Sequence, residues 1–282
     1  MTQITRDGKT ILVLGGTGKT GRRVAERLKA RGLPVRVGSR SGSPPFDWTD
    51  PGTWAPALDG AAAAYLAYQP DLAVPGAVDA IRGLTETALA GGTRRLVLLS
   101  GRGEEEARAC EKVLADAGAE WTVLRCAWFA QNFSEGALTD PVREGEVVLP
   151  PGDVGEPFVD VDDIADVAFA ALTEDGHTGE LYELTGPRLL TFADAVAGIA
   201  EATGRDIRYA SVAPDAFAAG LRAQGVPAEA VDLLTYLFTT LFDGRNAHLG
   251  DGVQRALGRP PADFRDFARR TAATGIWNGA EQ

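Results

Sequence analysis

The sequence predicts an α/β protein: a doubly wound parallel sheet with a small, mostly helical C-terminal region. Two observations predict this fold class. Short apolar runs without alternation, such as residues 96–99, recur through the first half of the chain between amphipathic stretches, as expected for strands covered on both faces by helices. A glycine-rich turn, residues 15–21, follows the first of these runs and opens the first helix.

The individual elements follow from hydrophobic periodicity and from flanking Gly and Pro. Helical periodicity predicts helices over residues 19–31, 73–90 and 104–117. Alternation at residues 180–185 adds one strand in the second half, which is otherwise rich in helices and Pro/Gly loops. The remaining predicted strands cover residues 10–14, 34–39, 61–67, 95–100 and 121–125.

The change in character after the fifth strand predicts two domains. We expect a nucleotide-binding domain over residues 1–150, with a return segment near 158–187, and a smaller substrate or cap region over 188–282. The second part is expected to cover the carboxyl ends of the strands, where open α/β sheets bind ligands.

Composition excludes several classes of protein. A net charge of −11 argues against nucleic acid as a partner, and no run of 18 apolar residues could span a membrane. The polar segment Met1–Thr10 lacks a signal-peptide pattern, so we expect a cytoplasmic protein. We also expect it to be a monomer or a homodimer. Cys110 and Cys126 are expected in the core, and no residue spacing predicts a metal site.

The glycine turn predicts dinucleotide binding. Gly15 would permit the tight turn out of the strand, Gly18 would let amides approach a diphosphate, and Gly21 would let the helix pack closely. The diphosphate would lie at the helix N-terminus, where amides and the helix dipole favour an anion. A nucleoside-triphosphate loop is excluded because it needs a glycine where this chain has Val13.

The second strand predicts NADP(H) rather than NAD(H). An Asp or Glu usually follows this strand and holds the ribose 2′-hydroxyl, but none occurs between Arg27 and Phe46. Ser39 and Arg40 stand there instead. The planar, permanently charged guanidinium of Arg40 suits a 2′-phosphate; the alternative is an ordinary surface arginine.

These pieces resemble the NmrA-like atypical short-chain dehydrogenase/reductases, and within them the bacterial proteins similar to fungal festuclavine dehydrogenases. The resemblance covers about the first two thirds of the chain and also includes residues 98–101, 121–133 and 158–165. It implies a Rossmann domain and a small substrate domain.

The resemblance also implies site residues. Tyr68, Gln69 and Ser100 would lie near the nicotinamide, with Trp128 and Asn132 beside the substrate. Asp47 would contact the adenine and Arg40 the 2′-phosphate. The diphosphate would be held by Gly15, Thr17, Gly18, Lys19, Thr20 and Gly21.

The chain departs from typical short-chain reductases in its catalytic pair. Those enzymes use a Tyr four residues before a Lys, the Tyr donating a proton to the developing alkoxide. Lys112 stands at the lysine position, but Arg108 precedes it by four residues. The candidate catalytic residues are therefore Ser100, Lys112 and Asn132, although a Ser that ends a strand is as often a turn residue.

Two functions remain open on the sequence. One is an NADPH-dependent reductase of a small hydrophobic imine or iminium, quinone or carbonyl compound. The missing Tyr favours the first two substrate classes, because an iminium takes up hydride without a proton. The other is a non-catalytic NADP(H) sensor that binds a protein partner. The acidic residues Asp160, Asp162 and Asp163 are expected to support a helix N-terminus rather than catalysis.

Overall fold

A computed structural model of the protein describes residues 8–279 and divides them into two compact units. Unit 1 holds the described chain up to Cys126, together with Val161–Leu184 and Gly250–Arg259. Unit 2 holds Ala127–Asp160, Thr185–Leu249 and the described chain from Pro260. The prediction about a signal peptide in Met1–Thr10 rests mainly on residues outside the described range.

Unit 1 is built on a six-stranded sheet in the order β2-β1-β3-β4-β5-β7, with every pairing parallel. The six strands are those that the sequence predicts, and the predicted doubly wound α/β fold is confirmed. Their bounds are β1 Thr10–Leu14, β2 Val35–Gly38, β3 Ala61–Leu66, β4 Arg95–Gly101, β5 Glu120–Cys126 and β7 Glu180–Leu184.

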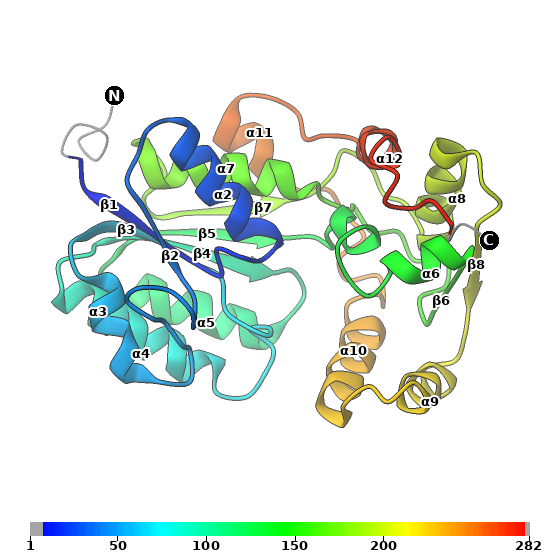
Figure 1. Ribbon diagram of the computed structural model, residues 1–282, viewed down its shortest axis with the longest axis horizontal. Helices are drawn as coiled ribbons and strands as arrows, with labels where there is room; N and C mark the ends of the chain where they lie inside the picture. Colours follow the sequence, from blue (N-terminus) through cyan, green and yellow to red (C-terminus); the bar gives the residue numbers. More distant parts are fainter. Residues whose placement is uncertain (1–7, 280–282) are drawn as a thin grey trace. The chain divides into compact units, whose positions relative to one another are not determined.

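Helices cover both faces of this sheet, which explains the unbroken apolar runs of its strands (Figure 1). One face carries α2 (Lys19–Ala30) and α7 (Val161–Thr173), which pack against each other. The other carries α4 (Ala77–Ala90) and α5 (Glu105–Asp116), with the short α3 (Trp54–Leu58) after the turn η1 (Pro51–Thr53). The helix α11 (Gly252–Leu257) lies against α7 and β7.

Unit 2 combines a small parallel sheet with several helices. Its sheet pairs β6 (Glu146–Leu149) with β8 (Arg208–Ser211). These strands have four residues each, and the sequence analysis did not predict them. The remaining elements are η2 Ala130–Phe133, α6 Thr139–Glu144, α8 Phe192–Thr203, α9 Pro214–Ala223, α10 Ala228–Thr240 and α12 Phe264–Ala272.

Rings from distant parts of the sequence form the core of unit 2. Phe133, Phe158, Phe192 and Trp277 are fully or almost fully buried, and neighbouring ring centroids lie 5 to 6 Å apart. The Trp277 indole N–H donates to the Phe133 carbonyl oxygen over 2.7 Å. Aromatic packing therefore joins segments that the chain separates by more than a hundred residues.

The observed division differs from the predicted boundaries at two places. Residues 127–150, which the prediction assigned to the first domain, lie in unit 2, because Phe133 and its neighbours pack into the aromatic core. Gly250–Arg259 lies in unit 1, because Gly250 and Gly252 approach the backbone of Glu183 in β7 so closely that a Cβ would meet it within 3 Å. The predicted return segment does contain α7 and β7.

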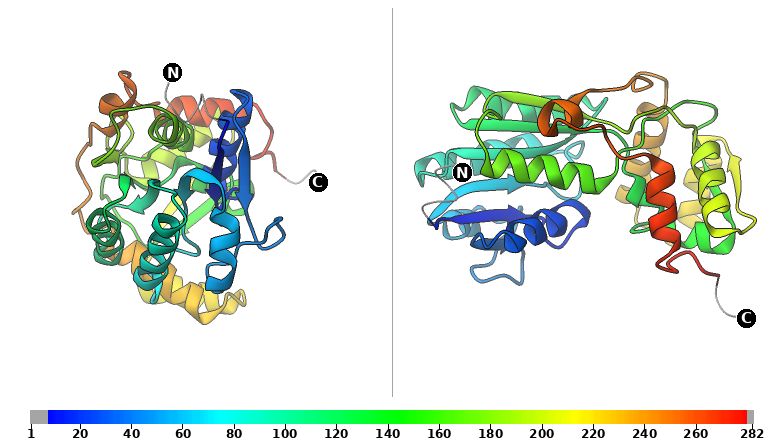
Figure 2. Two further views of the ribbon diagram at one scale, coloured as in Figure 1. Left: turned by 90° about the vertical axis from the view of Figure 1, so that its left-hand side faces the viewer. Right: turned by 90° about the horizontal axis from the view of Figure 1, so that it is seen from above.

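Further predictions concern burial. Cys110 and Cys126 are both free thiols and both buried, which confirms their predicted place in the core. Among residues 8–279, no helix is long and apolar enough to cross a membrane. Figure 2 shows the two units from two other directions.

Candidate functional site

The glycine loop joins β1 to α2 and depends on backbone approaches that only glycine allows. Gly15 has φ +66° and accepts a hydrogen bond from the Gly18 amide over 2.9 Å. A Cβ on Gly21 would stand 2.3 Å from the Gly15 carbonyl oxygen, well inside van der Waals contact. The predicted roles of these glycines in the turn and in helix packing therefore have direct geometric reasons.

The start of α2 has the properties of an anion site. Its N-cap, Gly18, is extended and supplies no side-chain hydrogen bond to the first turn. A Cβ there would have two neighbours within 4 Å: the Gly15 carbonyl oxygen at 3.2 Å and Gln69 Nε2 at 3.8 Å. An open backbone surface at a helix N-terminus fits a diphosphate. Of the other predicted residues, Thr17 is exposed, Lys19 half-buried and Thr20 buried.

Tyr68 and Gln69 lie beside this loop. In the order β2-β1-β3, the strand order reverses between β1 and β3. Open α/β sheets bind ligands at such a switch point, outside the carboxyl ends of the strands. Ala67, directly after β3, comes within 3.0 Å of where a Cβ on Gly15 would be. Tyr68 follows and packs against Trp48, with ring centroids 4.9 Å apart. The structure thus brings the glycine loop and the residues after β3 together.

Ser39 and Arg40 begin a tight turn after β2. The Ser39 carbonyl oxygen accepts hydrogen bonds from the amides of Gly42 and Phe46, and its hydroxyl lies 3.5 Å from the Ser41 hydroxyl. Arg40, at the outside of this turn, is exposed. Two hydroxyls and one guanidinium on a short turn can bind a phosphate group.

Asp47 is engaged within its own loop. Its carboxylate accepts hydrogen bonds from the amide and the hydroxyl of Thr49, which lower the pKa of Asp47, and Arg40 lowers it further by its charge. Trp48, which the sequence analysis did not single out, connects this loop to the segment after β3 by donating from its indole to the Ala67 carbonyl oxygen over 3.2 Å.

Ser100, at the carboxyl end of β4, belongs to a buried polar network. Its hydroxyl donates to Glu111 Oε1 of α5 over 2.6 Å. Arg125 of β5 donates to both oxygens of Glu111 and, over 3.1 Å, to Glu183 of β7. The sequence analysis missed Glu111, although a signal was present: Ala107, Cys110 and Leu114 form the apolar stripe of α5, and position 111 lies within it.

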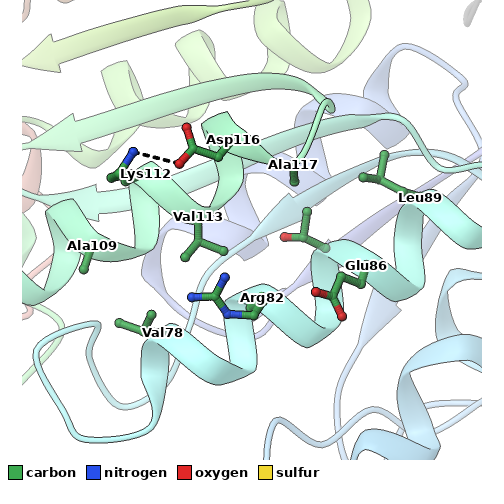
Figure 3. Close-up of a pocket in the computed structure, with 10 residues that line it drawn as sticks. Val78, Arg82, Glu86, Leu89, Ala109, Lys112, Val113, Asp116 and Ala117 are labelled. Atoms are coloured by element: carbon green, nitrogen blue, oxygen red, sulfur yellow. Dashed lines mark hydrogen bonds and ion pairs between the residues drawn. The ribbon is translucent and has the colours of Figure 1, made fainter.

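Lys112 lies elsewhere. It is exposed and forms an ion pair over 2.8 Å with Asp116 one turn along α5. Figure 3 shows the pair beside a surface groove between α4 and α5, lined also by Arg82 and Glu86. The structure does not bring Lys112 to Ser100; the residue of α5 that reaches Ser100 is Glu111.

A second carboxyl group is buried at the same edge of the sheet. Glu104, at the start of α5, is 6% exposed and its side chain is hydrogen-bonded to Asp71 in the loop after β3. Burial, and then the charge of Asp71, raise the pKa of Glu104 to about 8. The pair therefore shares a proton at neutral pH.

The remaining predicted residues lie in unit 2. Asn132 is half-buried in η2. Trp128 packs against Phe238 and Phe242, with centroids 5.1 and 5.3 Å away, while Glu156 accepts a hydrogen bond from its backbone amide. Its indole N–H is buried and has no hydrogen-bond partner within the described residues.

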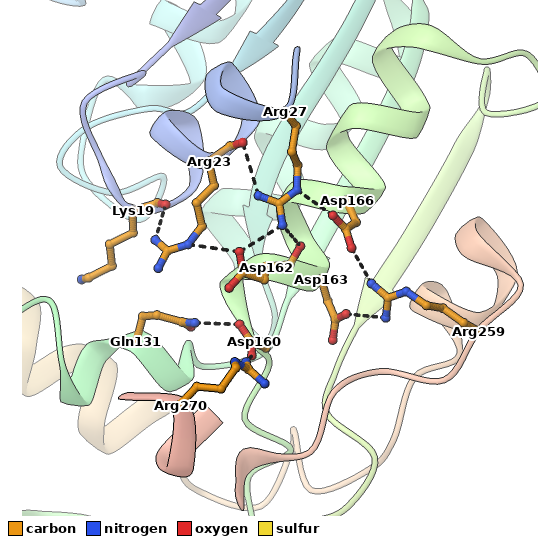
Figure 4. Close-up of polar contacts among 10 residues, drawn as sticks. All are labelled: Lys19, Arg23, Arg27, Gln131, Asp160, Asp162, Asp163, Asp166, Arg259 and Arg270. Carbon is orange, nitrogen blue, oxygen red and sulfur yellow. Dashed lines mark hydrogen bonds and ion pairs between the residues drawn. The ribbon is translucent and has the colours of Figure 1, made fainter. Parts of the chain in front are cut away.

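The acidic residues around α7 have structural partners. In unit 1, Asp162 pairs with Arg23 and Arg27 of α2, and Asp163 with Arg259 (Figure 4). In unit 2, Asp160 is bound by Gln131 and Arg270. These contacts support the expectation that the acidic residues stabilise the fold, though they do so through arginines more than through the helix dipole.

The sheet, its switch point and the glycine loop define a Rossmann-type dinucleotide-binding protein. No family model matches the chain. Curated relatives do. An agroclavine dehydrogenase from Claviceps fusiformis is 33% identical, covering 92% of this chain and 96% of the relative. A festuclavine dehydrogenase from Aspergillus fumigatus is 32% identical, covering 94% and 98%.

Solved structures share the fold. A triphenylmethane reductase from Citrobacter, complexed with NADP(H), has a TM-score of 0.75 at 19% identity, covering 93% of this chain and 99% of that one. An NADPH-dependent quinone oxidoreductase from Escherichia coli has 0.75 at 22%, covering 92% and 99%. The negative transcriptional regulator NmrA has 0.67 at 16%, covering 95% and 99%. The chain belongs to the NmrA-like atypical short-chain dehydrogenase/reductases, the family that includes the clavine dehydrogenases.

Proposed function

We propose that the protein is an NADPH-dependent reductase of a small hydrophobic imine or iminium, or of a quinone. The observation that carries the proposal is the open glycine loop at the start of α2, combined with Arg40 and two serine hydroxyls on the turn after β2. Bound NADPH supplies a hydride from its nicotinamide ring. The residues of the chain must bind and orient the two reactants.

The diphosphate would be held by the amides that follow Gly18, with Gln69 beside them. Arg40, Ser39 and Ser41 would take the 2′-phosphate, and the absence of an acidic residue between Arg27 and Phe46 removes the usual holder of a free 2′-hydroxyl. The nicotinamide end would then point toward the carboxyl ends of β3 and β4, near Tyr68 and Ser100.

The residues of α5 favour substrates that can accept a hydride without a proton donated by a tyrosine. Its inward positions one turn apart are Ala107 and Glu111, so neither the tyrosine nor the lysine of typical short-chain reductases faces Ser100. An iminium carbon accepts hydride while its nitrogen takes the C=N electron pair, and no proton is required. A simple ketone is disfavoured because no tyrosine of α5 faces Ser100 to donate a proton to the developing alkoxide.

The names of the relatives and structural neighbours support the same range of substrates: agroclavine, festuclavine, triphenylmethane dyes and quinones. Within unit 2, the aromatic group around Trp128 and its buried, unpaired indole N–H suit a flat hydrophobic molecule with one hydrogen-bond acceptor.

A non-catalytic NADP(H) sensor is the second candidate. It is favoured by the same lack of a Tyr and Lys facing Ser100, and a structural neighbour is a negative transcriptional regulator. Both candidate functions require NADPH binding, so only a measurement of substrate turnover distinguishes the reductase from the sensor.

The test begins with calorimetric titration of NADPH and NADH into the wild type, Arg40→Ala and the control Arg82→Ala, an exposed arginine on α4. Arg40→Ala should weaken NADPH about 10- to 100-fold by losing charge-assisted bonds to phosphate. Its NADH affinity, like both affinities of Arg82→Ala, should stay unchanged. Equal weakening of NADH would contradict the assignment of Arg40.

Turnover is then measured with cyclic imines, quinones and ketones by following absorbance of the reduced cofactor. Reduction of imines or quinones, with little or none of ketones, is the expected result. Tight NADPH binding without turnover of any member of the panel would favour the sensor.

A further inference from the structure

The hydroxyl hydrogen of Ser100 is engaged in a hydrogen bond within the protein. Its Oγ is 2.6 Å from Glu111 Oε1, and both side chains are buried, Ser100 at 4% and Glu111 at 6% exposure. A hydroxyl has one donor hydrogen and two acceptor lone pairs. Since a carboxylate can only accept, the Ser100 hydrogen points at Glu111 and its lone pairs point elsewhere.

Arg125 fixes this orientation. It donates from Nε to Glu111 Oε1 over 3.0 Å and from a second nitrogen to Oε2, a two-point contact that holds the carboxylate in place. Arg125 is itself held by Glu183, which is also paired with Arg102 at 3.6 Å. The network ties β4, β5, β7 and α5 together, so Glu111 has little freedom to release the serine.

The position of Ser100 makes this orientation relevant to a ligand. It is the second-last residue of β4, which pairs with β3, and β3 leads into Tyr68 and Gln69 beside the glycine loop. The carboxyl edge of a parallel sheet is its ligand-binding edge. A reactant that is bound at this edge and reaches Ser100 Oγ would find there a hydrogen-bond acceptor and no free donor.

We propose that Glu111 is a positioning residue that holds Ser100 as an acceptor and thereby selects cationic or N–H-bearing substrates over neutral carbonyls. This inference rests on the proposed function and narrows it. An iminium or protonated imine places positive charge or an N–H against Ser100 Oγ. A ketone or quinone oxygen presents lone pairs to lone pairs, which repels.

The reaction balances without an acid. The substrate carbon gains hydride with its two electrons, the C=N π pair becomes the nitrogen lone pair, and the cofactor is oxidised to NADP⁺. Neither Ser100 nor Glu111 gives up a proton, in agreement with an ion-paired Glu111.

The principal test compares Glu111→Gln with Glu105→Gln, the same change at an exposed position on the same helix. The amide of the glutamine can donate a hydrogen bond to Ser100 Oγ, which leaves the hydroxyl hydrogen of Ser100 free to point toward the ligand. Glu111→Gln should lower the ratio of kcat/KM for a cyclic iminium to that for a quinone about tenfold, the worth of one charge-assisted hydrogen bond. Glu105→Gln should leave the ratio unchanged.

Equilibrium binding gives a readout independent of turnover. Calorimetry on the NADP⁺-loaded protein compares a protonated cyclic amine with the cyclic ether of the same size. The wild type should prefer the amine, and Glu111→Gln should lose about tenfold of that preference. Ser100→Ala, which leaves the Glu111–Arg125 pair in place, should lose it too, and the double variant should lose no more than either single one.

Ser100→Ala decides the outcome if Glu111→Gln does not fold. An unchanged ratio and an unchanged amine preference in a variant that still binds NADPH would overturn the inference and leave the proposed function standing. A wild type that fails to bind NADPH would overturn the proposed function, and the inference with it.

Discussion

The two units are stabilised by different kinds of interior. Unit 1 places buried ionisable side chains at the carboxyl edge of its sheet, among them Glu104, Glu111 and Arg102. Unit 2 fills its interior with rings from five or more separate segments, including Phe133 and Trp277. Ionisable side chains held in fixed positions at one edge of a sheet suit the binding of a charged cofactor. An interior of aromatic rings suits contact with a hydrophobic molecule.

The largest effect is expected from removing Trp277 in unit 2. Trp277→Ala deletes a fully buried ring and its hydrogen bond to Phe133, and should lower the free energy of unfolding by about 3–5 kcal/mol in denaturant titration. Trp121→Ala, a partly buried Trp in unit 1, is the matched control and should cost less. A loss below about 1 kcal/mol for Trp277→Ala would mean that the rings do not hold unit 2 together.

A smaller effect is expected from the carboxyl pair of unit 1. The pKa of Glu104 is raised from 4.5 to about 8, so the folded state keeps a proton that the unfolded state loses. The stability contributed by this proton is complete below pH 4.5 and is lost as pH rises toward 8. Glu104→Gln, which is neutral at every pH, should remove this loss.

The difference in unfolding free energy between the wild type and Glu104→Gln should therefore change by on the order of 3 kcal/mol across that pH range, the variant gaining as pH rises. Glu105→Gln, exposed on the same helix, should run parallel to the wild type. A pH-independent difference for Glu104→Gln would show that Asp71 and Glu104 do not share a proton.

The smallest effect is expected at Lys112. Its ion pair with Asp116 is exposed and spans one helical turn, so Lys112→Ala should cost less than about 0.5 kcal/mol of stability. Turnover and NADPH affinity should remain as in the wild type. A large loss of kcat would instead restore Lys112 to the catalytic residues and require α5 to turn its outer face toward the substrate.

The sequence predicted unit 1 well because its signals are local. Unbroken apolar runs mark the buried strands, and the spacing of Gly15, Gly18 and Gly21 is tied to approaches within one turn of chain. Unit 2 was harder, since β6 and β8 are short and its core forms between segments far apart in sequence. No local period reveals that Phe133 meets Trp277.

The candidate site shows the same division. Tyr68 and Gln69 were predicted through the resemblance, which could be applied because they follow a recognisable strand, and the structure brings them beside the glycine loop. Glu111 was missed because resemblance drew attention to Lys112, one residue further, and because a charged residue is seldom expected within an apolar stripe. The burial of Glu111 is explained by Arg125 of β5, which donates hydrogen bonds to both of its carboxylate oxygens.

The interleaving of the units bears on how the protein is made. The chain passes from one unit to the other after Cys126, Asp160, Leu184, Leu249 and Arg259. A growing chain on the ribosome cannot pair β5 with β7, or cover the sheet with α7, until more than half of it has been translated. The segment synthesised first is thus completed late, and a nascent chain of about 150 residues would present the open edge of β5 to chaperones.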